Sequence, residues 1–133
     1  MRPTCLLVAI ICLAIPGAKG AADDGPAQPI TVTSLIQTLS ETVEDAEVIV
    51  DHVVVAPNAA LPKHWHHGEE FVYLLKGSVT LFMEGEDDID HRAGELVKIP
   101  YQKVHWVVAG DSGATAVAFR LHHHGKPHRV IID

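Results

Sequence analysis

Hydrophobic residues along this chain recur in short, mostly β-branched runs separated by turn residues. In the clearest run, residues 47–55, six of the nine positions are valine or isoleucine. Such side chains pack well on a pleated sheet, so this run predicts a strand that ends before Pro57 and Asn58. The segment at residues 31–39 fits either a strand or a short helix. Further strands are predicted at residues 70–75, 78–83, 96–99, 104–108 and 114–121.

Turn signals separate these runs. They are Lys76-Gly77, the acidic residues 84–88, Ala93-Gly94, Pro100 and the stretch at residues 110–113. Many short strands with no long segment of helical period are typical of an all-β sandwich or barrel. The acidic run from Glu84 to Asp90 lacks the spaced pattern of a calcium-binding loop, so we interpret it as a solvated hairpin tip.

The first 20 residues have the layout of a secretory signal peptide. A basic residue precedes an apolar run at residues 5–15, and small residues follow before cleavage after Gly20 or Ala22. This run is too short to span a bilayer, which needs about 20 apolar residues. We therefore expect a signal peptide at residues 1–20, a flexible arm at residues 21–29, and a mature protein that is periplasmic or secreted.

Composition then narrows the chemistry. Both cysteines, Cys5 and Cys12, lie in the leader, so the mature chain has neither disulfides nor thiolate metal ligands. Ten Lys and Arg residues against 17 Asp and Glu residues give a formal net charge of -7. A negative protein is poorly suited to binding the phosphate backbone of a nucleic acid. The 133 residues correspond to one domain. We expect no nucleic-acid partner and, after cleavage, no membrane partner.

The ten histidines are the unusual feature, because histidine is the commonest metal ligand. In a strand, His64 and His66 would share one face. A reversal at Gly68 would bring Glu70 beside them. Two histidines and one carboxylate suit Fe, and also Mn, Ni or Zn. His105, in a later predicted strand, is a fourth candidate ligand.

Two motifs in residues 58–109 resemble those of the cupin superfamily. The first family motif is G-x5-H-x-H-x3-4-E-x6-G, and here Asn58 precedes His64, His66, Glu70 and Gly77 at that spacing. The second is G-x5-P-x-G-x2-H-x3-N. The matching residues here are Gly94, Pro100, Gln102, His105 and Ala109.

Three positions depart from the motifs and none is a ligand. Asn58 and Gln102 replace glycines, and Ala109 replaces asparagine. Asparagine tolerates a left-handed backbone well, whereas Gln102 puts the turn before His105 in question.

The resemblance implies a single-domain cupin-type antiparallel β-barrel, the double-stranded β-helix or jelly roll, over residues 30–121. It also implies one divalent metal ion (Fe, Mn, Ni or Zn) on His64, His66, Glu70 and His105, and a homodimer. Residues 122–133 would form a His-rich C-terminal tail. An alternative ligand set in a shifted register would use His67 and Glu69.

Two functions fit such a site. The first is an enzyme acting on a small oxygen-rich molecule, either a dioxygenase or a metal-dependent isomerase or lyase. Tyr101 and Lys103 are then candidate acid–base groups. The second is a non-catalytic module that binds a ligand or metal. The tail histidines suggest adventitious metal affinity rather than a second site, and they are His122, His123, His124 and His128.

Overall fold

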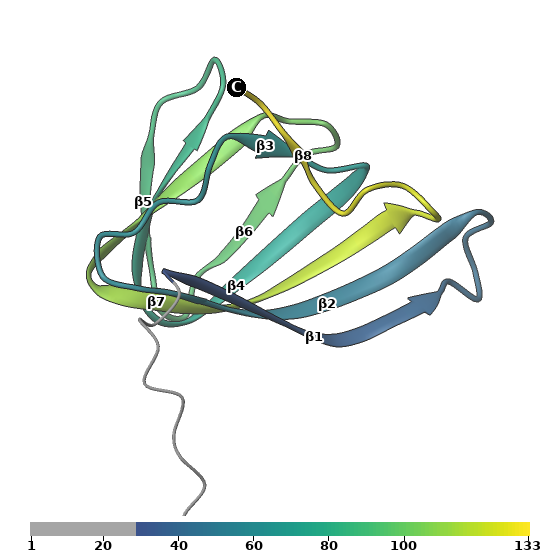
Figure 1. Ribbon diagram of the computed structural model, residues 1–133, viewed down its shortest axis with the longest axis horizontal. Coiled ribbons are helices and arrows are strands. Elements are labelled where there is room, and N and C mark those ends of the chain that lie inside the picture. Colours follow the sequence, from purple (N-terminus) through teal and green to yellow (C-terminus); the bar gives the residue numbers. More distant parts are fainter. Residues whose placement is uncertain (1–28) are drawn as a thin grey trace, which may run out of the picture.

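The computed structural model describes residues 29–133, which form eight strands (Figure 1). The predicted signal peptide and nearly all of the predicted arm lie outside this range. The strands are β1 (Ile30–Leu39), β2 (Ala46–Val55), β3 (His64–Trp65), β4 (Gly68–Met83), β5 (Ile89–Arg92), β6 (Leu96–Ile99), β7 (His105–His123) and β8 (Val130–Ile131).

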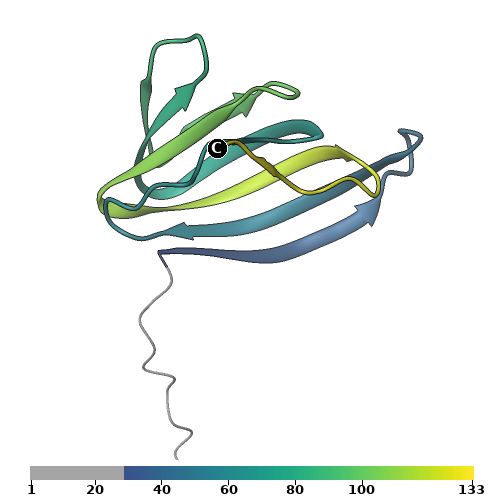
Figure 2. The same ribbon diagram turned by 45° about the horizontal axis from the view of Figure 1, so that its top comes forward.

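All pairings are antiparallel, and β4 and β7 belong to two facing layers. One layer has the order β1-β2-β7-β4-β6 and uses the C-terminal part of β7 with the N-terminal part of β4. The other has the order β5-β4-β7-β3-β8. The layers meet where β4 and β7 bend, at the left of Figure 1, and β1 forms an outer edge (Figure 2). This is the predicted all-β jelly-roll barrel.

The structure extends the predicted strands in several places. The ambiguous segment at residues 31–39 is a strand. The expected break at Gly77 and the expected turn at residues 110–113 are wrong, because β4 and β7 continue through them with shifts in register. The acidic run does form a hairpin tip, but its last residues begin β5, a strand that the hydrophobic pattern missed.

Close backbone contact explains why glycine occupies one of these bends. Gly77 has φ of 72°, and a β-carbon there would lie 1.9 Å from the carbonyl oxygen of Gly113. Asn58 and Gln102, which replace family glycines, also adopt the left-handed conformation, each with φ of 58°. The turn before His105 therefore forms with glutamine in place of glycine.

The C-terminal segment does not remain apart from the barrel. After β7 it turns at Gly125 and returns along the barrel mouth, where β8 pairs with β3. The backbone N–H of Ile132 donates to the carbonyl of Lys63 at 2.9 Å. Residues 29–133 include no helix with the length and apolar character needed to cross a membrane.

Candidate metal centre

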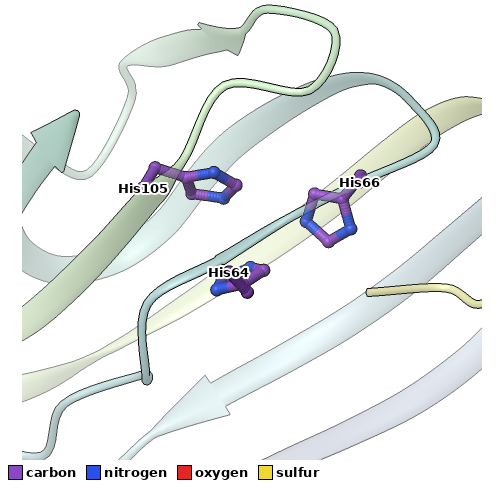
Figure 3. Close-up of side chains that lie close together, drawn as sticks. All are labelled: His64, His66 and His105. Carbon is purple, nitrogen blue, oxygen red and sulfur yellow. The ribbon is translucent and has the colours of Figure 1, made fainter. Parts of the chain in front are cut away.

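The structure brings together the four residues that the sequence predicted as metal ligands. His64 lies in β3, His66 follows it, Glu70 lies in β4 and His105 begins β7. All four side chains are buried. One ring nitrogen from each histidine lies within 4.8 Å of the other two, and the rings converge in Figure 3. The carboxylate oxygen Oε2 of Glu70 lies 3.3 Å from His66 Nε2 and 3.4 Å from His105 Nε2.

Backbone carbonyls fix the orientation of all three imidazoles. In each ring Nδ1 faces a carbonyl oxygen, which only accepts, so Nδ1 carries the hydrogen and Nε2 keeps a free lone pair. The contacts are His64 to Pro62 at 2.7 Å, His66 to His128 at 2.5 Å and His105 to Lys103 at 2.9 Å. Hydrogen bonding of the outer nitrogen is the usual way in which proteins orient metal-binding histidines.

This arrangement leaves electron pairs facing one another in a buried space. The Nε2 of His66 has no hydrogen-bond partner, and the nearest charged group is the Glu70 carboxylate, which is also an acceptor. A buried polar atom without a partner is costly, and two facing acceptors repel. A cation between the imidazole nitrogens and the carboxylate removes both costs, so these residues fit a divalent metal ion.

The electrostatics of the site favour these protonation states. Burial raises the pKa of the Glu70 carboxyl, but the His105 and His66 imidazoles together with the Arg120 guanidinium lower it to well below its ordinary value. Burial, followed by the neighbouring His105, lowers the pKa of His64 to about 4. Near neutral pH the site therefore presents an ionised carboxylate and a neutral His64, the forms that bind metal.

A buried ion pair beside the site was missed from the sequence. Asp51 of β2 pairs with Arg120 of β7, and both residues are buried. Arg120 Nη1 lies 3.8 Å from Glu70 Oε1. A signal for the pair exists, because alternation places Asp51 on the apolar face of its strand with Ile49 and Val53.

Several other candidates lie away from the centre. Glu69 pairs with Lys98 at 2.7 Å and the His67 ring packs against Trp65, so the shifted register is wrong. Of the two candidate acid–base groups, Lys103 pairs with Glu86 at 2.7 Å. The other, Tyr101, is exposed and packs against His123. Neither lines the cavity that holds the histidines.

The expectation of an exposed tail is correct for His123, His124 and His128 but wrong for His122. His122 lies in β7 and is almost fully buried. Its Nδ1 lies 3.5 Å from a carboxylate oxygen of Glu47 and 2.9 Å from the carbonyl oxygen of His123. Burial lowers the pKa of His122 despite these acceptors. His122 is therefore a packed residue of the barrel.

A cavity of about 100 Å³ lies between the two layers and reaches the candidate metal centre. Its walls are mainly valine, leucine, isoleucine and alanine side chains from both layers. Its polar lining comprises the three histidines, Glu70, Asp51, Arg120 and Arg129.

Comparison with known proteins agrees with this architecture. The sequence profile of the cupin domain family matches residues 51–122, which carry all four converging side chains. The chain belongs to the cupin family. Members of this family bind small-molecule ligands, and the histidine cluster is consistent with a metal-binding cupin. The resemblance expected from the two sequence motifs is thereby confirmed.

Sequence and structure comparisons place other cupins beside this one. An uncharacterised protein of Methanocaldococcus jannaschii is 23% identical over 65 residues, which span 49% of this chain and 56% of that protein. A cupin-like protein from Thermotoga maritima has a TM-score of 0.64 at 22% identity, covering 77% of this cupin and 75% of its own chain.

Two structural neighbours carry names that state an activity. The DMSP lyase DddQ from Ruegeria pomeroyi has a TM-score of 0.66 at 20% identity, covering 90% of this chain and 58% of its own. The polyketide cyclase RemF from Streptomyces resistomycificus has a TM-score of 0.62 at 23% identity, covering 80% of this chain and 74% of its own. At these identities the likeness shows the shared fold alone.

Proposed function

We propose that this cupin binds one divalent metal ion on His64, His66, Glu70 and His105, and uses it to bind or transform a small oxygen-rich molecule. The observation that carries the proposal is the orientation of the three imidazoles. Each Nδ1 is held by a backbone carbonyl, so that three Nε2 lone pairs and one carboxylate face a common buried point. The metal is Fe, Mn, Ni or Zn, because imidazole and carboxylate ligands suit all four.

A metal ion in this cavity would supply Lewis acidity toward an oxygen atom of the bound molecule. The protein's own contribution is to hold the three imidazoles and the carboxylate in place, and to surround the molecule with apolar walls that exclude water. Asp51 and Arg120 form a neutral buried pair beside the ligands, which keeps the guanidinium close to Glu70.

Metal content tests the proposal directly. Untagged full-length protein, purified without a metal-affinity column, is expected to carry about one divalent ion per chain by elemental analysis. His66→Ala and His105→Ala should lower this content severalfold while circular dichroism still shows a folded β protein. The matched control is His124→Ala, which removes an exposed histidine. Equal metal content in His66→Ala and the parent protein would overturn the proposal.

The first candidate function is that of a metal-dependent enzyme, whose reaction is either oxygen-dependent or a lyase or isomerase reaction. Structural neighbours named as a lyase and a cyclase support the second group, since the same fold carries those activities. Oxygen consumption with Fe(II) and a panel of diketones and catechols tests for a dioxygenase. The alternative is a non-catalytic binding module. The non-catalytic module is favoured by the lack of an available acid–base group, because Tyr101 and Lys103 lie outside the cavity. Among residues 29–133, Glu70 and Asp51 are the only carboxylates that line the cavity, and Asp51 is paired with Arg120.

We further propose that the protein is exported, on the evidence of the basic, apolar and small-residue segments of residues 1–20. The mature form would be periplasmic or secreted. N-terminal sequencing of the protein from the exported fraction should begin after Gly20 or Ala22. A chain that still begins at Met1 would contradict export by cleavage.

A homodimer is the proposed assembly, and the outer face of the first layer supports it. Residues paired across neighbouring strands point to the same face of a sheet, and successive residues along a strand point to opposite faces. The strand register therefore shows which positions of the first layer line the cavity and which face outward. Antiparallel sheets usually place polar residues on a solvated face. Here the outer positions include the apolar side chains Val48, Val50, Val117 and Leu121, together with the exposed Ile36, Val54, Tyr73, Leu96 and Phe119.

An apolar surface of this extent is typical of a protein–protein interface. Light scattering coupled to size-exclusion chromatography should give twice the monomer mass, and Phe119→Glu should shift the protein to monomer. An exposed residue elsewhere, Ile131, provides the matched control as Ile131→Glu. A parent protein that is monomeric at tens of micromolar would contradict the dimer.

A further inference from the structure

Arg129 of the C-terminal segment lies beside the candidate metal centre. β8 pairs antiparallel with β3 through Trp65 and Val130, so the next position along places Arg129 opposite His66. Opposed residues share a face, and Arg129 accordingly lines the cavity. The segment that carries it passes beside His66, whose Nδ1 donates to the carbonyl of His128 (Figure 3).

The guanidinium of Arg129 differs from that of Arg120 in its partners. Arg120 is paired with Asp51, whereas no carboxylate among residues 29–133 lies within 4.0 Å of the Arg129 guanidinium. Arg120 itself retains an unused donor, since its buried Nε has no hydrogen-bond partner. Arg129 and Arg120 both line the cavity. Together they offer N–H donors that the described residues do not use.

Formal charge in the cavity points to an anion. Asp51 and Glu70 balance Arg120 and Arg129, so a divalent ion bound at the histidines would leave two unbalanced positive charges in the cavity. An arginine fork matches the geometry of a carboxylate, which accepts two parallel N–H bonds. A carboxylate would therefore offset one of these two charges and accept hydrogen bonds from the unused donors.

The remaining walls and the volume limit the rest of the molecule. Aliphatic side chains from both layers form the walls, which suits an apolar body. The cavity of about 100 Å³ is smaller than the cavity of about 150 Å³ that accepts benzene in another protein. Ligands with several fused rings do not fit such a space without rearrangement of the walls.

We propose that this cavity binds a small organic anion, with one carboxylate on a compact apolar body and no more than about six heavy atoms in all. The carboxylate is held by Arg129 and by the unpartnered Nε–H of Arg120, which lines the same cavity. This inference names the ligand class of the proposed metal site and rests on that proposal for the excess positive charge. The arginine donors are present with or without a metal ion.

Calorimetric titration of zinc-loaded full-length protein with propionate and isobutyrate, against propionamide and isobutyramide, tests this inference. The uncharged amides match the carboxylates in size. We expect each carboxylate to bind at least tenfold more tightly than its amide. Losing a charge-assisted hydrogen bond costs about ten- to a hundredfold in affinity, so Arg129→Gln should remove most of that preference and Arg129→Lys should retain part of it. Arg92→Gln, at an exposed arginine of β5, is the matched control and should change nothing.

Zinc content, measured on the same samples, separates the two proposals. Zinc-loaded protein that shows no carboxylate preference overturns the anion inference and leaves the metal site intact. The anion inference is also overturned if Arg129→Gln leaves the carboxylate preference unchanged, or if the control Arg92→Gln lowers that preference as much as Arg129→Gln does. An arginine-dependent preference in protein that binds neither zinc nor iron, manganese or nickel supports the anion site and overturns the proposed metal function.

Discussion

The buried pair between Asp51 and Arg120 provides a quantitative test of the structure. Both residues are buried, at 5% and 4% exposure, so Asp51→Ala would leave an uncompensated positive charge inside the barrel. Removing one partner of a buried ion pair destabilises proteins by about 3–5 kcal/mol. Glu70 lies 3.8 Å from the same guanidinium and compensates in part. We therefore expect the lower end of this range, about 3 kcal/mol, in metal-free protein.

A loss of about 3 kcal/mol is a large share of the 5–15 kcal/mol that stabilises a typical domain. It corresponds to a drop of about 10 °C or more in melting temperature for a chain of this size. Urea unfolding followed by circular dichroism in excess chelator measures it as a lower midpoint with an unchanged slope. The exposed acidic residue Asp87 gives the control, since Asp87→Ala should lie within about 0.5 kcal/mol of the parent protein.

A double variant separates the charge from simple loss of packing. Replacing the pair with apolar groups, as Asp51→Ala with Arg120→Met, should recover much of the stability, because no unpaired charge remains. The reasoning is refuted if Asp51→Ala costs less than about 1 kcal/mol, or if the double variant is less stable than Asp51→Ala alone.

Three further predictions concern backbone conformation and pH. In urea unfolding, Gly77→Ala should destabilise the protein by about 3 kcal/mol or more, because the new β-carbon meets the Gly113 carbonyl. The control Gly85→Ala has a similar φ but open space around the new β-carbon, so it should cost about 1 kcal/mol. Equal losses of stability in the two variants would contradict the close approach at Gly77. Gln102→Gly should raise stability by about 1 kcal/mol by relieving left-handed strain, and a lower melting temperature would contradict this. Metal-free protein should lose stability as pH falls from about 6.5 to about 4, because His64 protonates in the unfolded chain before it does in the fold. His64 accounts for up to about 3 kcal/mol of this loss, and His64→Gln should show a flatter profile in urea midpoints across that range.

Strands were predictable where alternation and β-branched residues agree, as in β2 and β6. The breaks were not, because a glycine with positive φ serves equally in a turn or in a bend within a strand. At Gly77 the sequence signals a turn, but pairing with β7 continues on both sides of it. β5 was missed since its residues are mostly polar, and its pairing depends on the position of β4.

The candidate site was predictable to the extent that its signals are local or belong to a family motif. A period of two places His64 and His66 on one face, and the motif spacing adds Glu70 and His105. Arg120 and Asp51 lie on different strands, so their contact follows from the barrel closure and not from either segment alone. The carbonyl of His128 is equally invisible in sequence, because it reaches His66 only after the chain has returned along the mouth.

The use of main-chain oxygens to orient the imidazoles has a consequence for sequence drift. Substituting the side chain of Lys103 or His128 leaves the acceptor in place, so these positions are free to change without turning the rings. A shift in chain path is different, since one residue inserted or deleted between Gly125 and His128 moves the oxygen away from His66. In this protein the geometry of the site is therefore sensitive to loop length and tolerant of loop composition.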